Sequence, residues 1–560
     1  MTRYIALSCL AVGWLVPIHF LPWVSWHSEV LAFAAVLLLA WQGILQTAKK
    51  NIPSVVSFPA STVPLILLAL LVWLQFATGT ITFGGDSLVL TLYLLGCVAC
   101  LVLGSAYSGT HRTHIALAIT FVLAAFLSAV VAFVQTLDLW EGSAWVSRMP
   151  LLRRPGGNLG QPNQLATLLL LGLVSLIVLY ELKRLSALPS VLLALTLLMG
   201  AAATESRTGV LSFLFCSIWW FAKRKSLSFR LSPWPVLVAG TGFLCLFWTW
   251  PWLMDIVLYT DSAGSTSVVD TRVGTRWLVW PQLLEAIFQR PWWGWGLGQV
   301  ASAHNTVVHA YTISEPFTYA HNILLDLALG IGVPLAVLVL ISALVWLWRR
   351  LRAVTSLAQW YFLALLLPVA VHSLLEFPFA YAYFLFPVMF AVGALDGMSG
   401  AQPAFRLGFK PTAGLLLIST ALMAWSVVEY LKIEEDFRVV RFEALRVGTT
   451  PPDYERPRVI LLTQLDALLH GGRIVPEPGM SADELDLARN VALRFPWPAT
   501  QNRYALSLAL NGNPAEAVRQ LRVMRVLHGE KSYVQIKANW DGLAAEKYPQ
   551  LRDLTLPPER

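Results

Sequence analysis

Two histidine–asparagine pairs are the clearest candidates for acid–base chemistry in this sequence. His321-Asn322 directly precedes a long apolar run, and His304-Asn305 lies upstream in a more polar segment. A neutral imidazole can accept a proton from an attacking hydroxyl group and so act as a general base. A histidine at the start of a helix can instead pair with a neighbouring group, and spacing alone does not choose between the two histidines.

Seven arginines form a second pattern, because they occupy three segments between apolar runs and no lysine accompanies them. They are Arg148, Arg153, Arg154, Arg207, Arg272, Arg276 and Arg290. A guanidinium group binds phosphate oxygens through two donors and keeps its proton. Arg207 lies in a very short connection between apolar runs, where a charge is costly and usually functional, and Arg272 and Arg276 share a helical face. The pattern indicates an anionic ligand; contact with lipid headgroups or with acids such as Glu205 is the alternative.

Amides and carboxylates supply further candidates. The segment Arg154-Pro155-Gly156-Gly157-Asn158-Leu159-Gly160-Gln161-Pro162-Asn163-Gln164 combines glycines, which allow tight turns, with neutral donors and acceptors suited to a sugar phosphate. Asn163 is also expected to cap the helix that follows. His372 and Glu376 stand at the end of a later apolar run, where Glu376 can orient a basic group or contact sugar hydroxyls. No cluster has metal-ligand spacing, so we expect no metal.

The stretch Trp292-Trp293-Gly294-Trp295-Gly296-Leu297-Gly298 is open to several interpretations. Its glycines resemble a phosphate-binding loop, but no strand and helix flank them, so we reject that function. Its tryptophans either stack on sugar rings or anchor the chain at the surface of a membrane.

The composition determines what kind of protein must position these residues. Of 560 residues, 57% are hydrophobic and 13% are charged, and the mean hydropathy is +0.63. Soluble proteins carry roughly 25% charged residues, so a soluble enzyme, a disordered chain and a disulfide scaffold are excluded. Residues 433–560 hold 17 basic and 17 acidic residues, which is 34 of the 72 charges. The sequence therefore predicts a transmembrane domain over 1–432 and a small domain of zero net charge over 433–560.

Thirteen apolar runs approach the roughly 20 residues that a membrane-spanning helix needs. They lie near 5–22, 29–48, 62–80, 88–107, 114–135, 163–181, 188–204, 209–222, 234–257, 321–348, 357–376, 380–397 and 413–431. The predicted fold is an all-α polytopic membrane protein with about 13 transmembrane helices. The longest connections, near 136–162 and 258–320, contain most of the candidate residues.

Alternate connections differ in positive charge, which predicts the orientation in the membrane. One set contains 15 lysines and arginines in seven short segments, and the other set contains the seven arginines described above. Because basic loops remain in the cytoplasm, we expect a cytoplasmic N-terminus, and thirteen spans then place residues 433–560 outside. The net charge of +8 follows from this asymmetry and requires no nucleic-acid partner.

The C-terminal segment is predicted to be helical. Residues 504–510 are followed by Asn513, Pro514 and Glu516, a pattern typical of an N-cap, a first helical residue and a capping box. The predicted hairpin is similar to a single tetratricopeptide repeat. It either recruits an acceptor or covers the membrane domain.

Four motifs together resemble the O-antigen ligase/polymerase superfamily, and within it the bacterial protein O-oligosaccharyltransferases of the PglL type. These motifs are Arg154 to Ala166, Ser206-Arg207-Thr208-Gly209, the Gly294 to Gly298 stretch with His321-Asn322, and His372-Ser373-Leu374-Leu375-Glu376-Phe377-Pro378. The resemblance covers essentially the whole chain and implies a GT-C-like fold. Phe377 stands where a tyrosine is expected in that branch, so a role of its hydroxyl group would be lost or moved here.

The resemblance implies an enzyme of the bacterial inner membrane. It would transfer a preassembled glycan from undecaprenyl pyrophosphate to a Ser or Thr hydroxyl of a periplasmic protein such as pilin, with inversion and without metal or other cofactor. His321 would act as base or hold the acceptor, and Arg207, Arg272 and Arg276 would bind pyrophosphate. The other substrate-binding candidates would be Arg154, Asn158, Gln161, Asn163, Asn322, His372 and Glu376.

Three alternatives remain at this level. An O-antigen ligase would use the same chemistry on lipid A–core, and a polymerase would use a growing glycan. A lipid or glycan transporter would belong to a different class, but transporters usually place charged residues at mid-membrane in broken helices. The candidates here gather toward one side, which favours an enzyme.

Overall fold

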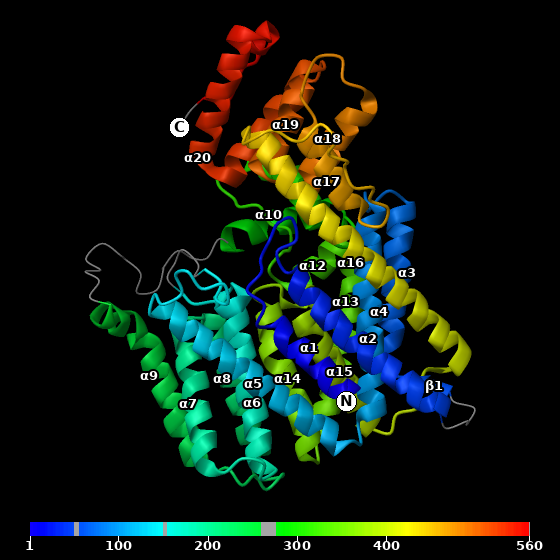
Figure 1. Cartoon of the computed structure of the whole chain (residues 1–560), viewed down its shortest axis with the longest axis vertical. Coiled ribbons are helices and arrows are strands. Elements are labelled where there is room, and N and C mark those ends of the chain that lie inside the picture. Colours follow the sequence, from blue (N-terminus) through cyan, green and yellow to red (C-terminus); the bar gives the residue numbers. More distant parts are fainter. Residues whose placement is uncertain (50–54, 149–153, 259–275, 559–560) are drawn as a thin grey trace. The chain divides into compact units, whose positions relative to one another are not determined.

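The computed structural model describes residues 1–49, 55–148, 154–258 and 276–558 (Figure 1). The expectations for Lys50, Arg153 and Arg272 therefore lie outside the described residues. The described chain is predominantly helical and contains one pair of short strands. This is consistent with the predicted all-α membrane protein.

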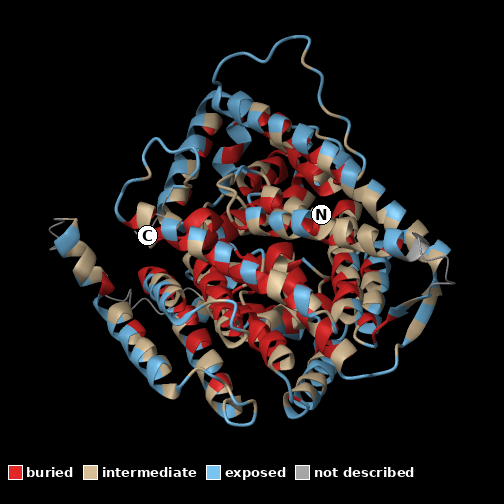
Figure 2. Ribbon diagram, turned by 60° about the horizontal axis from the view of Figure 1, so that its bottom comes forward, coloured by how far each residue is buried: buried red, intermediate tan, exposed pale blue. Residues whose placement is uncertain are grey.

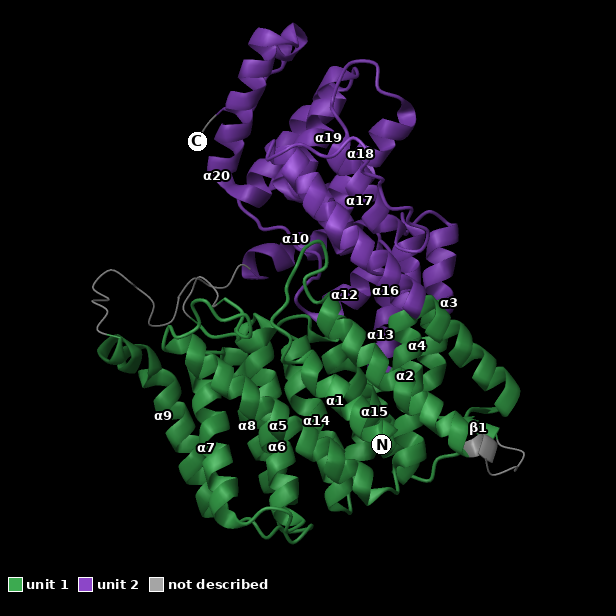
Figure 3. Ribbon diagram, in the orientation of Figure 1, with its two compact units in different colours: residues 1–69, 92–269, 342–423 green, residues 70–91, 270–341, 424–560 purple. Residues whose placement is uncertain are grey.

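The chain divides into two compact units, drawn in separate colours in Figure 3. Unit 1 comprises residues 1–69, 92–269 and 342–423, and unit 2 comprises residues 70–91, 270–341 and 424–560. Helices that lie entirely in unit 1 are α1 (Thr2–Gly13), α2 (Trp26–Lys49), α5 (His111–Thr136), α6 (Pro162–Glu181), α7 (Ala187–Ala203), α8 (Arg207–Lys223), α9 (Pro233–Val257), α14 (Leu357–Ser373) and α15 (Ala382–Met398). Helices α3 (Thr62–Ala77), α4 (Gly84–Tyr107), α13 (Val333–Arg352) and α16 (Phe409–Leu445) contribute residues to both units.

Helix α6 is at the centre of unit 1. It packs against α5, α7, α8 and α14, and 78% of its most apolar stretch is buried, compared with 17% for α9. Figure 2 shows buried residues concentrated on the inner helices and exposed ones at the margins. Close packing needs a glycine here, because a Cβ atom at Gly172 would lie 2.4 Å from the Cβ of Ala125 on α5. The helix that carries Asn163 is therefore held from several sides.

Many helices have the length and composition of membrane spans. Among the described residues, seven helices (α2, α4, α5, α6, α9, α13 and α16) are long and apolar enough to cross a membrane, and α1, α3, α7, α14 and α15 are shorter apolar helices. Helix α8 accounts for the remaining predicted run. The membrane character follows the prediction, whereas the number of thirteen spans and their orientation stay predictions.

A two-stranded antiparallel sheet in unit 1 was not expected from the sequence. Strand β1 (Val55–Phe58) pairs with β2 (Phe405–Gly408), so that Phe58 faces Phe405 with ring centroids 4.6 Å apart. Four residues in each strand are too few for alternation to be recognised between long apolar runs. The sheet joins the segment before α3 to the segment before α16.

Unit 2 combines the second long connection with the C-terminal segment. Its helices are α10 (Arg276–Gln289), α11 (Val300–Val307), α12 (Ile323–Ile331), α17 (Thr463–Arg473), α18 (Ala482–Arg494), α19 (Pro498–Leu510) and α20 (Pro514–Glu546). Helix α16 continues through residue 432, so the predicted domain boundary falls inside a helix. Val308 packs against Val523, Val526 and Leu527 of α20. The C-terminal helices thus share a core with residues near 308.

The predicted apolar run over 321–348 is two helices, so the expectation of a single helix there is wrong. Helices α12 and α13 are separated at Gly332, whose φ angle is +79°. A Cβ atom at Gly332 would lie 2.2 Å from the carbonyl oxygen of Trp292, and Val333 N donates to Pro291 O at 2.7 Å. The backbone of Pro291 and Trp292 therefore packs against the break between α12 and α13. The apolar pattern of the sequence did not predict this break.

Candidate active site

The predicted site residues fall into two groups, one in each unit. Unit 1 contains Arg154, Asn158, Gln161, Asn163, Arg207, His372 and Glu376, and unit 2 contains Arg276, His321 and Asn322. Arg272 lies outside the described residues. Each group has its own local geometry.

A glycine turn precedes α6 in unit 1. Gly157 and Gly160 have φ angles of +59° and +70°, which glycine adopts without steric cost. Gln135, from α5, binds both backbone groups of Gly157: Oε1 accepts from its N–H at 2.8 Å, and Nε2 donates to its carbonyl at 3.1 Å. Sequence reasoning missed Gln135 because one amide in an apolar run gives no spacing signal.

Asn158, predicted to bind substrate, is a structural link within this turn. The side chain is 4% exposed. Its Nδ2 donates to the carbonyls of Leu15 and Trp145 at 2.7 and 2.8 Å, and its Oδ1 accepts from Ser147 N at 3.0 Å. These contacts use both amide protons, so the geometry favours a role in positioning the turn over direct contact with a ligand.

The cap of α6 is Gln161, and the expectation that Asn163 caps this helix is wrong. The Gln161 Oε1 accepts from Gln164 N at 3.1 Å, while Pro162 is the first helical residue. Asn163 is consequently inside the helix, where its side chain is available for other partners.

Asn163 joins three segments of unit 1. Its Oδ1 accepts from Ser206 Oγ at 2.7 Å, and its Nδ2 donates to Glu376 Oε1 at 3.3 Å. Ser206 Oγ also accepts from Gly209 N at 3.0 Å and caps α8. The Glu376 side chain is buried. Asn163 therefore links α6 to the cap of α8, directly before Arg207, and to the segment after α14 that carries Glu376.

Arg154 and Glu205 shape the connection between α7 and α8. The Arg154 Nε donates to the carbonyl of Thr204 at 2.9 Å, and Nη2 donates to the carbonyl of Glu205 at 3.1 Å. Glu205 has a φ angle of +49°, a conformation that a residue with a side chain rarely adopts. Burial raises the pKa of Glu205, and the Arg154 charge opposes that rise. Arg154 therefore positions the connection that presents Arg207.

Arg207 is the first residue of α8 and is exposed. The N-terminus of a helix carries partial positive charge from its free N–H groups, so a guanidinium group at this position adds to a field that attracts anions. A basic residue here is unfavourable for the helix itself, which is consistent with a functional role.

His372 pairs with α6 one turn beyond Asn163. The Thr167 hydroxyl donates to the carbonyl of Asn163 at 3.0 Å, so it accepts from His372 Nδ1, which is 2.8 Å away. The proton on His372 is therefore assigned to Nδ1. The side chain is 1% exposed. His372 and Glu376 on one segment thus face Thr167 and Asn163 on α6 as two successive pairs.

In unit 2, His321 occupies a tightly held turn before α12. Its φ angle is +53°, and its ring lies against Phe317 with centroids 4.4 Å apart. The preceding residue, Ala320, is fixed on both sides, because its N–H donates to Asp326 Oδ2 and its carbonyl accepts from Trp280 Nε1, each at 2.9 Å. The turn therefore holds the half-buried imidazole of His321 on a strained backbone. Backbone strain of this kind recurs at functional sites.

Asn322, predicted to bind substrate, caps α12. Its Oδ1 accepts from Leu324 N at 2.9 Å and from Leu325 N at 3.3 Å. The cap fixes where α12 begins and hence the direction in which the His321 turn leaves the helix. The contact of Asp326 with the backbone of Ala320 gave no signal in the sequence.

Arg276 is the first residue of α10, one turn before Trp280. Residues four apart share a helix face, and Trp280 is the residue whose indole contacts Ala320. Arg276 is therefore on the side of α10 from which the His321 turn is held. Arg290 instead lies over the ring of Trp295, with 4.1 Å between its Cζ atom and the ring centroid.

The structure separates the two histidines that spacing left equivalent. His304 is 2% exposed and its Nε2 lies 2.8 Å from Gln282 Oε1. Burial lowers the pKa of His304 to about 4. His304 is thus a neutral core residue of unit 2, and His321 is the better placed to meet a substrate.

Three family models match successive parts of the chain. One described as "Protein glycosylation ligase" matches residues 155–180, "O-Antigen ligase" matches 192–340, and "Virulence factor membrane-bound polymerase, C-terminal" matches 360–541. The chain is 28% identical to the general O-oligosaccharyltransferase of Acinetobacter baylyi over 540 residues, which covers 94% of this chain and 92% of that protein. The resemblance to the O-antigen ligase superfamily and its protein-glycosylating branch is confirmed.

A second relative is the ComP-specific O-oligosaccharyltransferase of the same organism, 28% identical over 374 residues, or 66% of each chain. The three models include all the predicted site residues except Arg154. The glycosylation ligase match contains the glycine turn and Asn163, the O-antigen ligase match contains Arg207, Arg276 and His321, and the third match contains His372 and Glu376. The motifs that carried the resemblance therefore lie inside or directly beside the matched regions.

Proposed function

We propose that this chain transfers a preassembled glycan from undecaprenyl pyrophosphate to the Ser or Thr hydroxyl of a periplasmic protein, at the periplasmic face of the bacterial inner membrane. The observation that carries the proposal is the similarity to a general O-oligosaccharyltransferase along 94% of the chain. The half-buried His321 and the exposed Arg207 at a helix start support it, because glycosyl transfer from a pyrophosphate needs a proton acceptor and a partner for the leaving group.

The proposed reaction is a single displacement at the anomeric carbon. The acceptor hydroxyl oxygen forms the new bond to this carbon, the bond to the pyrophosphate oxygen breaks, and configuration inverts. His321 accepts the hydroxyl proton or holds the hydroxyl in place. Arg207, Arg276 and Arg272 offset the charge that grows on the undecaprenyl pyrophosphate leaving group. We assign no metal to this reaction.

The polar residues of unit 1 take supporting roles in this proposal. Glu376, held by Asn163, contacts hydroxyl groups of the sugar in this proposal, and His372 supports the same pair of helices through Thr167. Arg154, Asn158 and Gln161 position the glycine turn and the connection before Arg207, as their backbone contacts indicate. Asn322 positions His321 through the cap of α12.

An O-antigen ligase is the second candidate, because the model that includes His321 carries that description. The test is reconstitution in a bacterial host that makes a lipid-linked glycan but lacks its own ligases. Wild type, His321→Ala and the control His470→Ala are expressed with a pilin-like protein and intact lipid A–core. Glycan on the protein, absent only with His321→Ala, supports the proposal. Glycan on lipid A–core instead assigns the ligase, and glycan on neither acceptor contradicts both.

A further inference from the structure

An apolar crevice in unit 1 is lined by α1 from Arg3 to Leu10. It lies between α1, α2, α4, α5 and α15 and has a cavity volume of about 60 Å³. Leu7, Leu10, Val36 and Phe390 are among the side chains that line it. The span from Arg3 to Leu10 is seven residues of helix, or about 10 Å. The crevice therefore has the length and polarity for part of a hydrocarbon chain.

One basic residue stands at the end of this crevice. Arg3 is the only charged residue among those that line it, beside the hydroxyl groups of Tyr107 and Thr113. Arg3 Nη1 donates to Thr113 Oγ1 at 3.3 Å, and its buried Nε has no hydrogen-bond partner among the described residues. Arg112 is exposed on the same turn of α5 as Thr113. The Arg3 guanidinium group thus has an unused hydrogen-bond donor and lies next to an apolar crevice. This arrangement complements an anionic headgroup that is joined to an acyl chain.

The crevice is separate from the residues assigned to catalysis. Asn158 of the glycine turn donates to Leu15 O, beyond the far end of α1, whereas Arg3 is near its start. Arg3 and Leu15 are twelve residues apart, which corresponds to about 18 Å in helical geometry. A lipid whose phosphate lies on Arg3 is therefore not the glycan donor of the proposed reaction.

We infer that this crevice binds one anionic phospholipid, with an acyl chain between α1, α2 and α15 and its phosphate on Arg3. This site does not depend on the proposed transferase function. A zwitterionic phospholipid supplies the same acyl chain but offsets the phosphate charge with an ammonium group, so it should bind less well.

The test is native mass spectrometry of the full chain, released from nanodiscs that contain equal amounts of phosphatidylglycerol and phosphatidylethanolamine. Wild type should retain one phosphatidylglycerol in preference. Arg3→Gln should lower the ratio of retained phosphatidylglycerol to phosphatidylethanolamine about fivefold, the effect of one lost charge near a lipid headgroup. Arg3→Lys should keep the preference, and Ala35→Leu, which fills the crevice, should reduce retention of both lipids.

Arg406→Gln, on the exposed strand β2, is the matched control and should resemble wild type. Circular dichroism and size-exclusion chromatography establish that each variant is folded. If Arg3→Gln unfolds, the comparison of Arg3→Lys with Ala35→Leu decides the question, since only Ala35→Leu should lose the lipid. Equal retention of both lipids by wild type, or an unchanged ratio in folded Arg3→Gln, would overturn the inference and leave non-specific surrounding lipid.

Discussion

The Asn163 side-chain amide donates to the buried Glu376 carboxylate, with 3.3 Å between Nδ2 and Oε1. The same amide accepts from Ser206 at 2.7 Å. Asn163 therefore couples the start of α6 to the segment after α14 and to the cap of α8, directly before Arg207. A change at Asn163 should be felt at both of these places.

Asn163→Ala is expected to lower glycosyl transfer at least tenfold and to destabilise the chain by about 2 kcal/mol, because the buried Glu376 carboxylate loses a donor. Asn163→Asp should be worse at neutral pH, since it places a second carboxylate beside Glu376. Transfer in membranes and thermal unfolding of purified protein measure the two effects. Asn513→Ala removes the cap of α20 and should cost about 1 kcal/mol without a comparable loss of transfer. Equal transfer by Asn163→Ala and wild type would contradict the coupling.

His321→Ala should reduce transfer at least 100-fold while thermal stability changes little, because general base catalysis contributes roughly that much and the side chain is only half-buried. The matched control is His470→Ala, a half-exposed histidine that pairs with Asp466 at the surface of α17. Quantitative transfer assays on both variants check this. Activity of His321→Ala within twofold of wild type would exclude a role as base.

The stability of unit 2 should fall on acidification because of His304. Burial lowers the pKa of His304 to about 4 from the ordinary value of 6.5. Between these values the unfolded chain binds a proton that the folded chain does not, so stability decreases as the pH falls from 6.5 toward 4, by about 3 kcal/mol in total. Thermal unfolding of wild type and His304→Gln across this range measures the effect. The slope with pH should be smaller in the variant, and parallel curves would argue against this assignment.

Gly332→Ala should be strongly destabilising, by roughly 3 kcal/mol or more, because it combines a positive φ angle with a Cβ atom 2.2 Å from Trp292 O. Gly298→Ala separates the two causes. Gly298 also has a positive φ angle, +73°, but its nearest neighbour, Leu90, is 3.9 Å from the added Cβ. Gly298→Ala should therefore cost only about 1 kcal/mol, and equal unfolding temperatures for the two variants would disprove the packing explanation.

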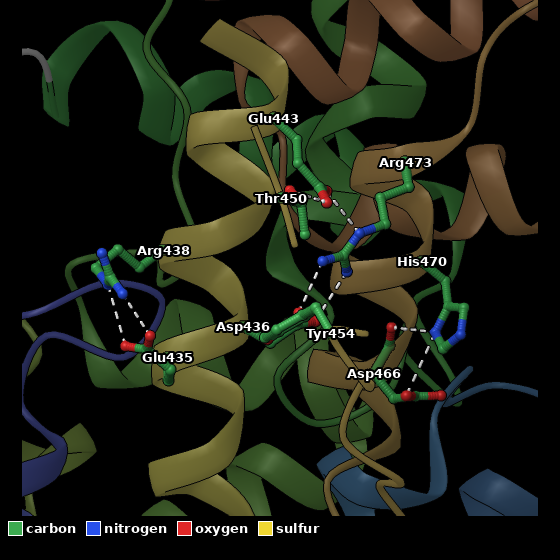
Figure 4. A network of polar contacts seen from close by, with 9 residues as sticks. All are labelled: Glu435, Asp436, Arg438, Glu443, Thr450, Tyr454, Asp466, His470 and Arg473. Carbon is green, nitrogen blue, oxygen red and sulfur yellow. Dashed lines mark hydrogen bonds and ion pairs between the residues drawn. The ribbon is translucent and has the colours of Figure 1, made fainter. Parts of the chain in front are cut away.

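The carboxylate network of α16 and α17 contains one buried and one exposed arginine–carboxylate pair, which can be compared by mutation (Figure 4). Arg473 binds Asp436 through two bonds of 2.7 and 2.8 Å, and the Asp436 side chain is 1% exposed. Arg473→Met should destabilise unit 2 by about 3–5 kcal/mol, because it leaves a buried carboxylate without its cation. Arg438→Met removes a partner of the exposed Glu435, a pair that solvent screens, so the unfolding temperature should stay close to that of wild type. Thermal unfolding that ranks the variants in the opposite order would refute this.

Much of the membrane fold was predictable because long apolar runs are a strong signal. The limits of the sequence signal appear where backbone contacts decide the structure. The break at Gly332 lies inside a mostly apolar run that was predicted as one helix. The groups that pack against the break, Pro291 O and Trp292 O, belong to a turn that is distant in sequence. The predicted cap Asn513 is confirmed, but the capping box with Glu516 is wrong. Its carboxylate binds Arg519 and Gln520 instead.

For the candidate site, residue types predicted which segments carry polar chemistry but not how each side chain is used. Asn158 and Asn163 carry the same amide group and are five residues apart. The Asn158 amide protons both donate to backbone carbonyl groups, whereas Asn163 binds the side chains of Ser206 and Glu376. That difference depends on the glycine turn between them and on Gln135, whose partners are distant in sequence. His304 and His321 are likewise distinguished only by burial.

The shared core of unit 2 has a consequence for engineering. Val308 packs against α20, Asn305 Nδ2 donates to Gln520 Oε1 at 3.3 Å, and Ser314 N donates to Val526 O at 3.1 Å. A chimera that exchanges only the residues after 432 with those of a relative would lose these contacts. Residues 300–314 would then pack against C-terminal helices from a different protein. Grafts intended to change acceptor preference should therefore transplant residues 300–314 with the C-terminal helices, as one cassette.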